Sequence, residues 1–200
     1  MSKKQTQQQV SPRFLKWLRS LVGMIVALMA LGAYVRTMKA GLACPDWPLC
    51  FGKVIPDFHF GVWLEFIHRV DAALVSLVFL GCCFYALRAK AVPRATRRAA
   101  VVGLLLLFMQ ILMGGLTVLW LVRHVVVTTH LMLATFFLCS VLWMINTVDP
   151  RIDPQIDLRM KEGPEYPVAK VPFGFRLAVV ILPLAILFQI FLGGLVASTY

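Results

Sequence analysis

Long apolar segments alternate with short polar ones along the whole chain. Five runs approach or exceed the length of a membrane span, and they lie at Leu21–Val35, Val70–Leu87, Ala99–Val122, Val125–Ile145 and Leu177–Ala197. A helix needs about 20 apolar residues to cross a hydrocarbon core of about 30 Å. The runs are continuous rather than alternating in polarity, which is typical of membrane helices and not of barrel strands. The sequence therefore predicts an all-α polytopic membrane protein with five transmembrane helices.

Composition supports this class of protein. Hydrophobic residues make up 60% of the 200 residues, charged residues only 14%, and the mean hydropathy is +0.82. A soluble domain of this size needs more polar surface than that. The first apolar run follows a basic start, as the apolar centre of a signal peptide does, but its length favours a helix that is retained.

Basic residues alternate from one connecting segment to the next. Fifteen lie before the first helix, in the second connection or around the fourth, against four in the segments between. The fifteen are Lys3, Lys4, Arg13, Lys16, Arg19, Arg88, Lys90, Arg94, Arg97, Arg98, Arg151, Arg159, Lys161, Lys170 and Arg176. By the positive-inside rule the N-terminus is cytoplasmic, and segments 39–61 and 120–124 face outward. The net charge of +11 is thus a topology signal and not a sign of nucleic-acid binding. We expect a multi-pass protein, in contact with lipid, of a bacterial cytoplasmic membrane.

The segment after the fourth helix has a different composition from its surroundings. Residues 146–174 hold five of the eleven prolines and most of the acidic residues, which is typical of an extended linker. We expect a basic N-terminus at 1–19, a four-helix bundle at 20–145 with its outer loop at 39–61, and a cytoplasmic linker at 146–174. Residues 175–200 then supply the first helix of a second bundle.

An internal repeat supports this division. QILMGGL in the third helix matches QIFLGGL in the fifth, and LGAYVRT in the first matches LGGLVAS in the fifth. Small residues at these places allow close helix packing, but two matches together indicate a duplicated unit. Because only the first helix of the second unit is present, we expect an incomplete second bundle and a truncated or partial chain.

Two of the four histidines lie inside predicted helices at matching depth. His68 and His130 are each about six residues inside the outer end of a helix, roughly 9 Å below the outer surface. His59 and His124 fall in or beside outer loops, where a solvated role is expected. Two imidazoles at equal depth suit the two faces of one haem iron, although each could instead serve packing or hydrogen bonding. Zinc or copper would require further ligands beside the pair.

Neighbouring residues extend this candidate site. Glu65 precedes His68 by three positions, so both side chains share one face of the helix. A carboxylate there suits an oxidation that moves protons, whereas its alternatives are a membrane-edge charge or an orienting partner for a neighbouring His or Arg. Arg69 is placed to meet haem propionates or to extend towards the interface. The pair Gly114–Gly115 leaves room either for a porphyrin or for a close helix contact.

Cysteines divide into a loop pair and three helical residues. Cys44 and Cys50 end the segment CPDWPLC in the outer loop, where two prolines restrict the backbone and an oxidising environment favours a disulfide. Such a disulfide would act as a loop staple or as a redox-active pair. Cys82, Cys83 and Cys139 lie inside helices and are expected to act as small apolar side chains.

Four motifs in this order resemble the haem A synthase family: GLACPDWPLCFGKVIP, EFIHRVDAALVSL, QILMGGLTVL and VVVTTHLMLATFF. The resemblance extends from about residue 35 to residue 199. It implies eight membrane helices in two similar four-helix bundles, which oxidise a methyl group of haem O to formyl. The product, haem A, serves the assembly of terminal oxidases.

The resemblance also implies roles for individual residues. His68 and His130 would be the axial ligands of the iron of haem O, Glu65 would be important for activity, and Cys44 and Cys50 would form a disulfide. A haem b cofactor is implied in the second bundle, and its ligands lie in helices that this sequence does not include. We therefore expect that the chain alone binds haem without completing the reaction, or needs a partner chain. Haem O synthase and terminal oxidase assembly factors are the implied partners.

Two other classes of protein fit the same histidines. A membrane bis-histidine electron carrier like cytochrome b would use the pair but would have no use for Glu65. Extraction of the pigment distinguishes them, because haem O or haem A indicates the synthase and haem B alone indicates the carrier. A transporter or assembly subunit with structural histidines would show no Soret absorption even when haem is supplied.

Overall fold

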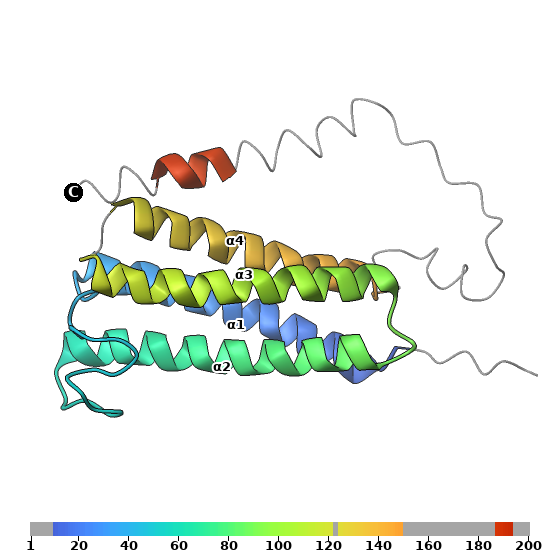
Figure 1. The fold of residues 1–200 in the computed structure, drawn as a ribbon, viewed down its shortest axis with the longest axis horizontal. Helices are drawn as coiled ribbons and strands as arrows, with labels where there is room; N and C mark the ends of the chain where they lie inside the picture. The colour runs from blue at the N-terminus through green and yellow to red at the C-terminus, as the bar shows by residue number, and fades with distance from the viewer. Residues whose placement is uncertain (1–9, 122–123, 150–186, 194–200) are drawn as a thin grey trace, which may run out of the picture.

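The computed structural model describes residues 10–121, 124–149 and 187–193. Its long helices are α1 (Pro12–Thr37), α2 (Phe60–Arg88), α3 (Arg94–Leu119) and α4 (His124–Asn146), which run up and down beside one another (Figure 1). Each is long and apolar enough to cross a membrane. The described residues contain no strand beyond one isolated bridge between Cys50 and Lys53. The predicted all-α membrane fold is confirmed.

The fifth predicted helix, Leu177–Ala197, lies largely outside the described residues. Its residues 187–193 are helical. The predicted linker also lies almost wholly outside them, so the proposed division into two bundles stays a prediction.

Helices extend beyond the apolar runs that predicted them. Helix α1 begins at Pro12, where a missing backbone N–H costs nothing because the first turn leaves that group unpaired. Helix α2 begins at Phe60, well before the apolar run that starts at Val70. The segment containing Glu65 and His68 is therefore part of α2, and its side chains follow the spacing of a helix.

The four helices are arranged in a closed ring. Helix α1 contacts α2 and α4, and α3 contacts the same two helices. Helices α2 and α4 are thus diagonal to each other across the bundle, as are α1 and α3. Side chains that point inward from α2 and α4 approach the interior from opposite sides.

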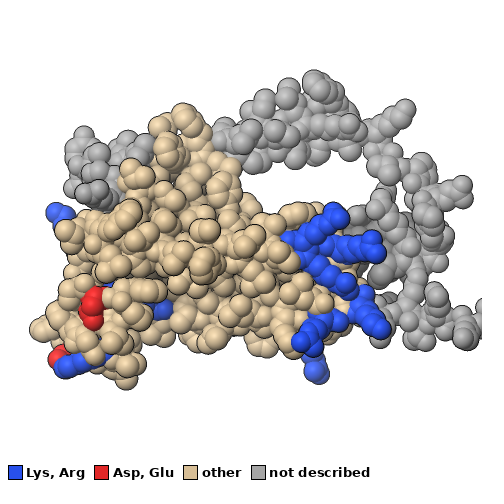
Figure 2. All heavy atoms as spheres, viewed as in Figure 1, with Lys and Arg blue, Asp and Glu red and all other residues tan. Residues whose placement is uncertain are grey.

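One end of the bundle is basic. Figure 2 shows Lys and Arg side chains gathered at the end that holds the start of α1 and the connection from α2 to α3. We call this the basic end, and we call the opposite end, which carries the connection from α1 to α2, the loop end. The uneven charge agrees with the predicted cytoplasmic N-terminus, which stays a prediction because the structure contains no membrane.

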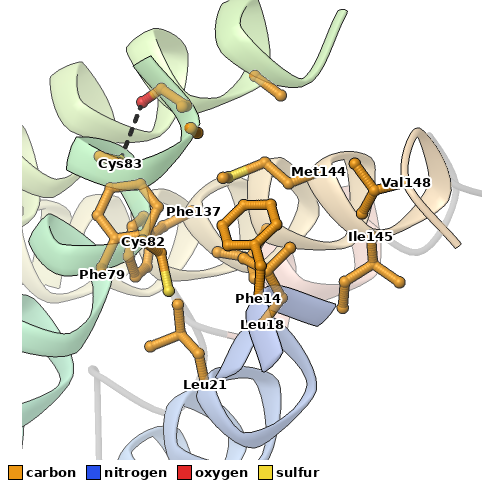
Figure 3. Packing of buried hydrophobic residues seen from close by; sticks show 14 of the residues in the cluster. Phe14, Leu18, Leu21, Phe79, Cys82, Cys83, Phe137, Met144, Ile145 and Val148 are labelled. Atoms are coloured by element: carbon orange, nitrogen blue, oxygen red, sulfur yellow. Dashed lines mark hydrogen bonds between the residues drawn. The ribbon is translucent and has the colours of Figure 1, made fainter. Parts of the chain in front are cut away.

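The main hydrophobic core lies towards the basic end. Phe79 is fully buried at its centre, and its ring meets that of Phe137 edge-on at a centroid distance of 4.7 Å (Figure 3). Leu18 and Met144 are also fully buried in this cluster. Cys83 lies in the same core, with its Sγ 3.7 Å from the carbonyl oxygen of Ala100.

Cys82 is likewise buried, so both residues pack as small core side chains, as predicted. Cys139, the third helical cysteine, lies on the exposed outside of α4. The basic end also holds an ion pair between Arg19 and the buried carboxylate of Asp149.

Candidate functional site

Two glycines make room for the two helical histidines. A Cβ added to Gly32 on α1 would lie 3.0 Å from Cε1 of His68, which comes from α2. A Cβ added to Gly114 on α3 would lie 3.2 Å from Cε1 of His130, which comes from α4. Contacts this short leave no space for a larger side chain. Each imidazole is therefore seated on a glycine of the neighbouring helix, and the arrangement occurs twice in the bundle.

The histidines lack protein partners that buried nitrogens normally have. Nδ1 of His68 and Nδ1 of His130 are both buried and accept or donate no hydrogen bond within the described residues. Nε2 of His130 lies 3.4 Å from the amide nitrogen of Gln110, whose own Oε1 is also buried and has no partner in the part of the chain that the structure describes. Buried polar atoms nearly always have a hydrogen-bond partner. Several unpaired ones therefore indicate a binding site for a group other than the protein chain itself.

The two imidazoles share one region of the bundle. They come from the two diagonal helices α2 and α4, and both lie towards the loop end of the bundle. His68 is eight residues after the start of α2, and His130 is six residues after the start of α4. At 1.5 Å per residue the two depths along their helices differ by about 3 Å.

An ion pair flanks His68 along α2, with Glu65 one turn before it and Arg69 directly after it. The side chain of Glu65 is almost fully buried, and its Oε1 accepts a hydrogen bond of 2.6 Å from Nη2 of Arg69. Its Oε2 accepts a second bond of 2.9 Å from the backbone N–H of Cys44 in the loop. Both carboxylate oxygens therefore have a hydrogen-bond partner, and bonds of this charge-assisted kind are stronger than those between neutral groups.

The guanidinium group of Arg69 binds the same loop. Its Nη1 donates to the carbonyl oxygens of Asp46 at 2.8 Å and Leu49 at 2.7 Å, and its Nη2 lies 3.4 Å from that of Cys44. Arg69 was predicted to contact haem propionates or to extend towards the interface. In the structure its Nη1 and Nη2 atoms donate hydrogen bonds to the loop backbone and to Glu65. We call the pair Glu65 and Arg69, with these bonds, the latch.

The latched loop is also held by internal bonds. Cys44 and Cys50 form a disulfide and are both buried. The carboxylate of Asp46 accepts hydrogen bonds from the backbone N–H groups of Gly52 at 2.8 Å and Phe51 at 2.6 Å. These bonds hold the pKa of Asp46 below its ordinary value. The loop therefore has a defined shape of its own.

The tip of the loop reaches across to α3. The indole of Trp47 lies over Gly115, with its nearest ring carbon 3.1 Å from the position of an added Cβ. Gly115 is the residue next to the seat of His130. The predicted glycine pair thus has two separate contacts, since Gly114 faces His130 and Gly115 faces Trp47.

Sequence reasoning selected the histidines, Glu65, Arg69 and the cysteines, and the structure brings them to the loop end. It missed Gly32, Gln110 and Trp47 as site residues. A signal for the first existed, because the match of LGAYVRT and that of QILMGGL to the fifth helix align Gly32 and Gly114 with the same residue, Gly193. No spacing rule indicated that Trp47 contacts α3, because that contact joins segments far apart in the chain.

Comparison with known proteins gives consistent results. The model of the COX15-CtaA family, described as cytochrome oxidase assembly protein, matches residues 15–60 and 56–200. A haem A synthase of Shewanella oneidensis is 33% identical, over 66% of this chain and 44% of the relative. One of Geobacillus thermodenitrificans is 31% identical, over 74% and 50%. The chain spans about half the length of these relatives. No solved structure matches.

Proposed function

The chain belongs to the COX15-CtaA family of cytochrome oxidase assembly proteins, and from this premise we propose that it acts in the oxidation of haem O to haem A. Two relatives that it resembles are named haem A synthases. The observation that carries the proposal is the pair of glycine-seated histidines on diagonal helices. Such an oxidation serves the assembly of terminal oxidases, in keeping with the description of the family.

The residues at the loop end fit a haem substrate. A haem iron accepts one axial nitrogen on each face, and a porphyrin is a flat apolar plate that needs a slot between helices. His68 and His130 enter the interior from opposite sides and would hold the iron of haem O. Their glycine seats keep large side chains away from the imidazoles. The unpaired nitrogens and the amide of Gln110 would supply the polar contacts of the site.

Glu65 is the candidate reactive carboxylate. Conversion of the methyl group to formyl removes electrons and protons from that carbon and adds an oxygen atom. A carboxylate beside the porphyrin edge would either accept a proton or stabilise the positive charge that develops there. Because both oxygens of Glu65 already accept hydrogen bonds, we favour charge stabilisation, since protonation would disrupt the latch.

The remaining assignments follow from the family. We propose that haem b is held by a second bundle, beyond the helices described here, and that haem O synthase supplies the substrate. We also propose that this integral membrane protein lies in a bacterial cytoplasmic membrane with a cytoplasmic N-terminus. The latter agrees with the gathering of Lys and Arg at the basic end.

The test is expression of the chain in cells that make haem O, followed by purification and extraction of the pigment. We expect haem O or haem A in the extract, whereas haem B alone would contradict the proposal. Glu65→Gln tests the carboxylate in the complete two-bundle protein, where loss of haem A with haem O still bound is expected. Unchanged accumulation of haem A with an unchanged haem spectrum would refute the role of Glu65.

A further inference from the structure

The latch fixes the loop to α2 through hydrogen bonds to the loop backbone. Four hydrogen bonds join the side chains of Glu65 and Arg69 to the backbone of the segment from Cys44 to Leu49. The side chain of Glu65 is 5% exposed and that of Arg69 is 16% exposed, so the ion pair is largely withdrawn from solvent. Burying two charges costs free energy, and the hydrogen bonds to the loop offset part of that cost.

The latch holds the side chain of Trp47 against the bundle. The loop bonds of Arg69 are accepted at Asp46 and Leu49, on both sides of Trp47 in the sequence, so the latch fixes the backbone around the indole. The ring then rests on Gly115 of α3, next to the seat of His130. The loop therefore bridges from α2 to α3 over the loop end of the bundle.

Two small clusters of buried apolar residues lie at this end. The buried apolar clusters there consist of Val35, Ala40 and Leu64, and of Cys44, Cys50 and Val62. A porphyrin held between the histidines would have its loop-end side open to water unless a broad side chain covers it. An indole offers a large apolar surface that packs well on a flat ring system, and 40% of Trp47 is still exposed and available.

We propose that Trp47 is a positioning residue of the haem site, where it covers the porphyrin beside His130 and is held in place by the latch. The inference rests on the proposed function. It gives Glu65 a second task, since part of any effect of a Glu65 substitution is then transmitted through the loop to Trp47.

The first experiment measures how fast the purified, haem-loaded full chain releases haem to an excess of apomyoglobin. For Trp47→Ala we expect haem release faster by about three- to tenfold, the loss that one aromatic contact represents. Trp47→Phe should restore most of the slow release. Trp120→Ala is the matched control, because Trp120 is an exposed tryptophan at the same end, and it should release haem at the wild-type rate.

A second variant tests the same contact without altering the loop. The Cβ of Gly115→Ala would lie 3.1 Å from the indole and displace it, so faster release is again expected. Gly23→Ala is its control, because nothing lies within 4 Å of an added Cβ at that residue. A purely structural role for Trp47 would instead lower the unfolding temperature of the haem-free protein and leave the release rate of the folded protein unchanged.

The latch is tested by combining substitutions. If Arg69 acts through Trp47, then Arg69→Gln should speed release, and Arg69→Gln with Trp47→Ala should be no faster than Trp47→Ala alone. Additive effects would overturn the link between latch and indole. Wild-type release from Trp47→Ala in a protein that binds haem would overturn the inference alone. A wild-type chain that takes up no haem would overturn the proposed function, and the inference with it.

Discussion

The two halves of the bundle differ in the side chains that the same four helices direct inward. Towards the basic end, large side chains such as Phe79, Leu18 and Met144 fill the interior and are fully buried. Towards the loop end, the inward positions include two glycines and two histidines, and the Nδ1 atoms of both imidazoles are buried with no partner among the described residues. The first half holds the helices together, and the second half is the proposed haem site.

Glycine shows the contrast most clearly, because the side chain that occupies the space beside it differs between the two halves. A Cβ added to Gly103 in the core would lie 2.5 Å from Cζ of Phe79 and 2.8 Å from Oγ of Ser140. There the missing side chain makes room for the ring of Phe79 and the hydroxyl group of Ser140. At Gly32 the missing side chain makes room for an imidazole instead. Substitutions in the two halves should therefore affect different properties.

The largest effect on stability is expected from Phe79→Ala. Removal of this fully buried ring should lower the free energy of unfolding by about 3–5 kcal/mol, because a cavity replaces the contact with Phe137. Unfolding in detergent measures the change. Phe108→Ala, which truncates an exposed ring on α3, is the control and should have a small effect. Equal destabilisation by the two variants would contradict the assignment of the core.

Gly103→Ala should be the next most disruptive change. The added methyl group overlaps Phe79, and overpacking of this kind costs about 1–3 kcal/mol. The folded fraction should still bind haem, because the histidine seats lie in the other half. Lost haem binding in a fully folded Gly103→Ala protein would show that the two halves are not separate in function.

Gly32→Ala and Gly114→Ala should show the reverse pattern. The added Cβ would force His68 or His130 to shift by a few tenths of an ångström, which we expect to weaken haem affinity by about tenfold. Unfolding of the haem-free protein should be unchanged or slightly harder, since Ala favours a helix over Gly by up to about 1 kcal/mol. Titration with haem and unfolding in detergent measure the two properties. Unaltered affinity would argue against the seats.

The smallest expected effect is a change in the conformation of the loop at acidic pH. The pKa of Asp46 is held below its ordinary value of 3.8 by hydrogen bonds from the N–H groups of Gly52 and Phe51. A carboxyl with a lowered pKa stabilises the folded loop above that value, and the contribution disappears as the pH falls through the folded pKa. We expect the fluorescence of Trp47 to change below about pH 4 and not between pH 5 and 8.

Asp46→Asn should remove that acid-dependent change. Asp57→Asn, which affects only the exposed pair with Lys53, should retain it and serves as the control. A fluorescence change of the same size and midpoint in Asp46→Asn would show that another group is responsible.

The features that could be predicted from the sequence are those that depend on helical periodicity and local spacing. Apolar runs located the four helices, and the spacing of Glu65 and His68 placed both on one face of α2. The sequence placed His68 about six residues inside its helix, and the structure begins α2 eight residues before His68, at Phe60. The sequence could not show that Arg69 binds the loop or that Trp47 reaches α3, since those contacts depend on how the loop folds back.

The most direct test of the central claim, that the loop half holds a haem between two histidines, is the electron paramagnetic resonance spectrum of the haem-loaded chain. We predict a low-spin ferric haem with two imidazole ligands in the wild-type protein. His68→Ala and His130→Ala should each convert it to a high-spin form or lose the haem, and added imidazole should restore the low-spin signal. A low-spin spectrum that survives unchanged in either variant would contradict the account.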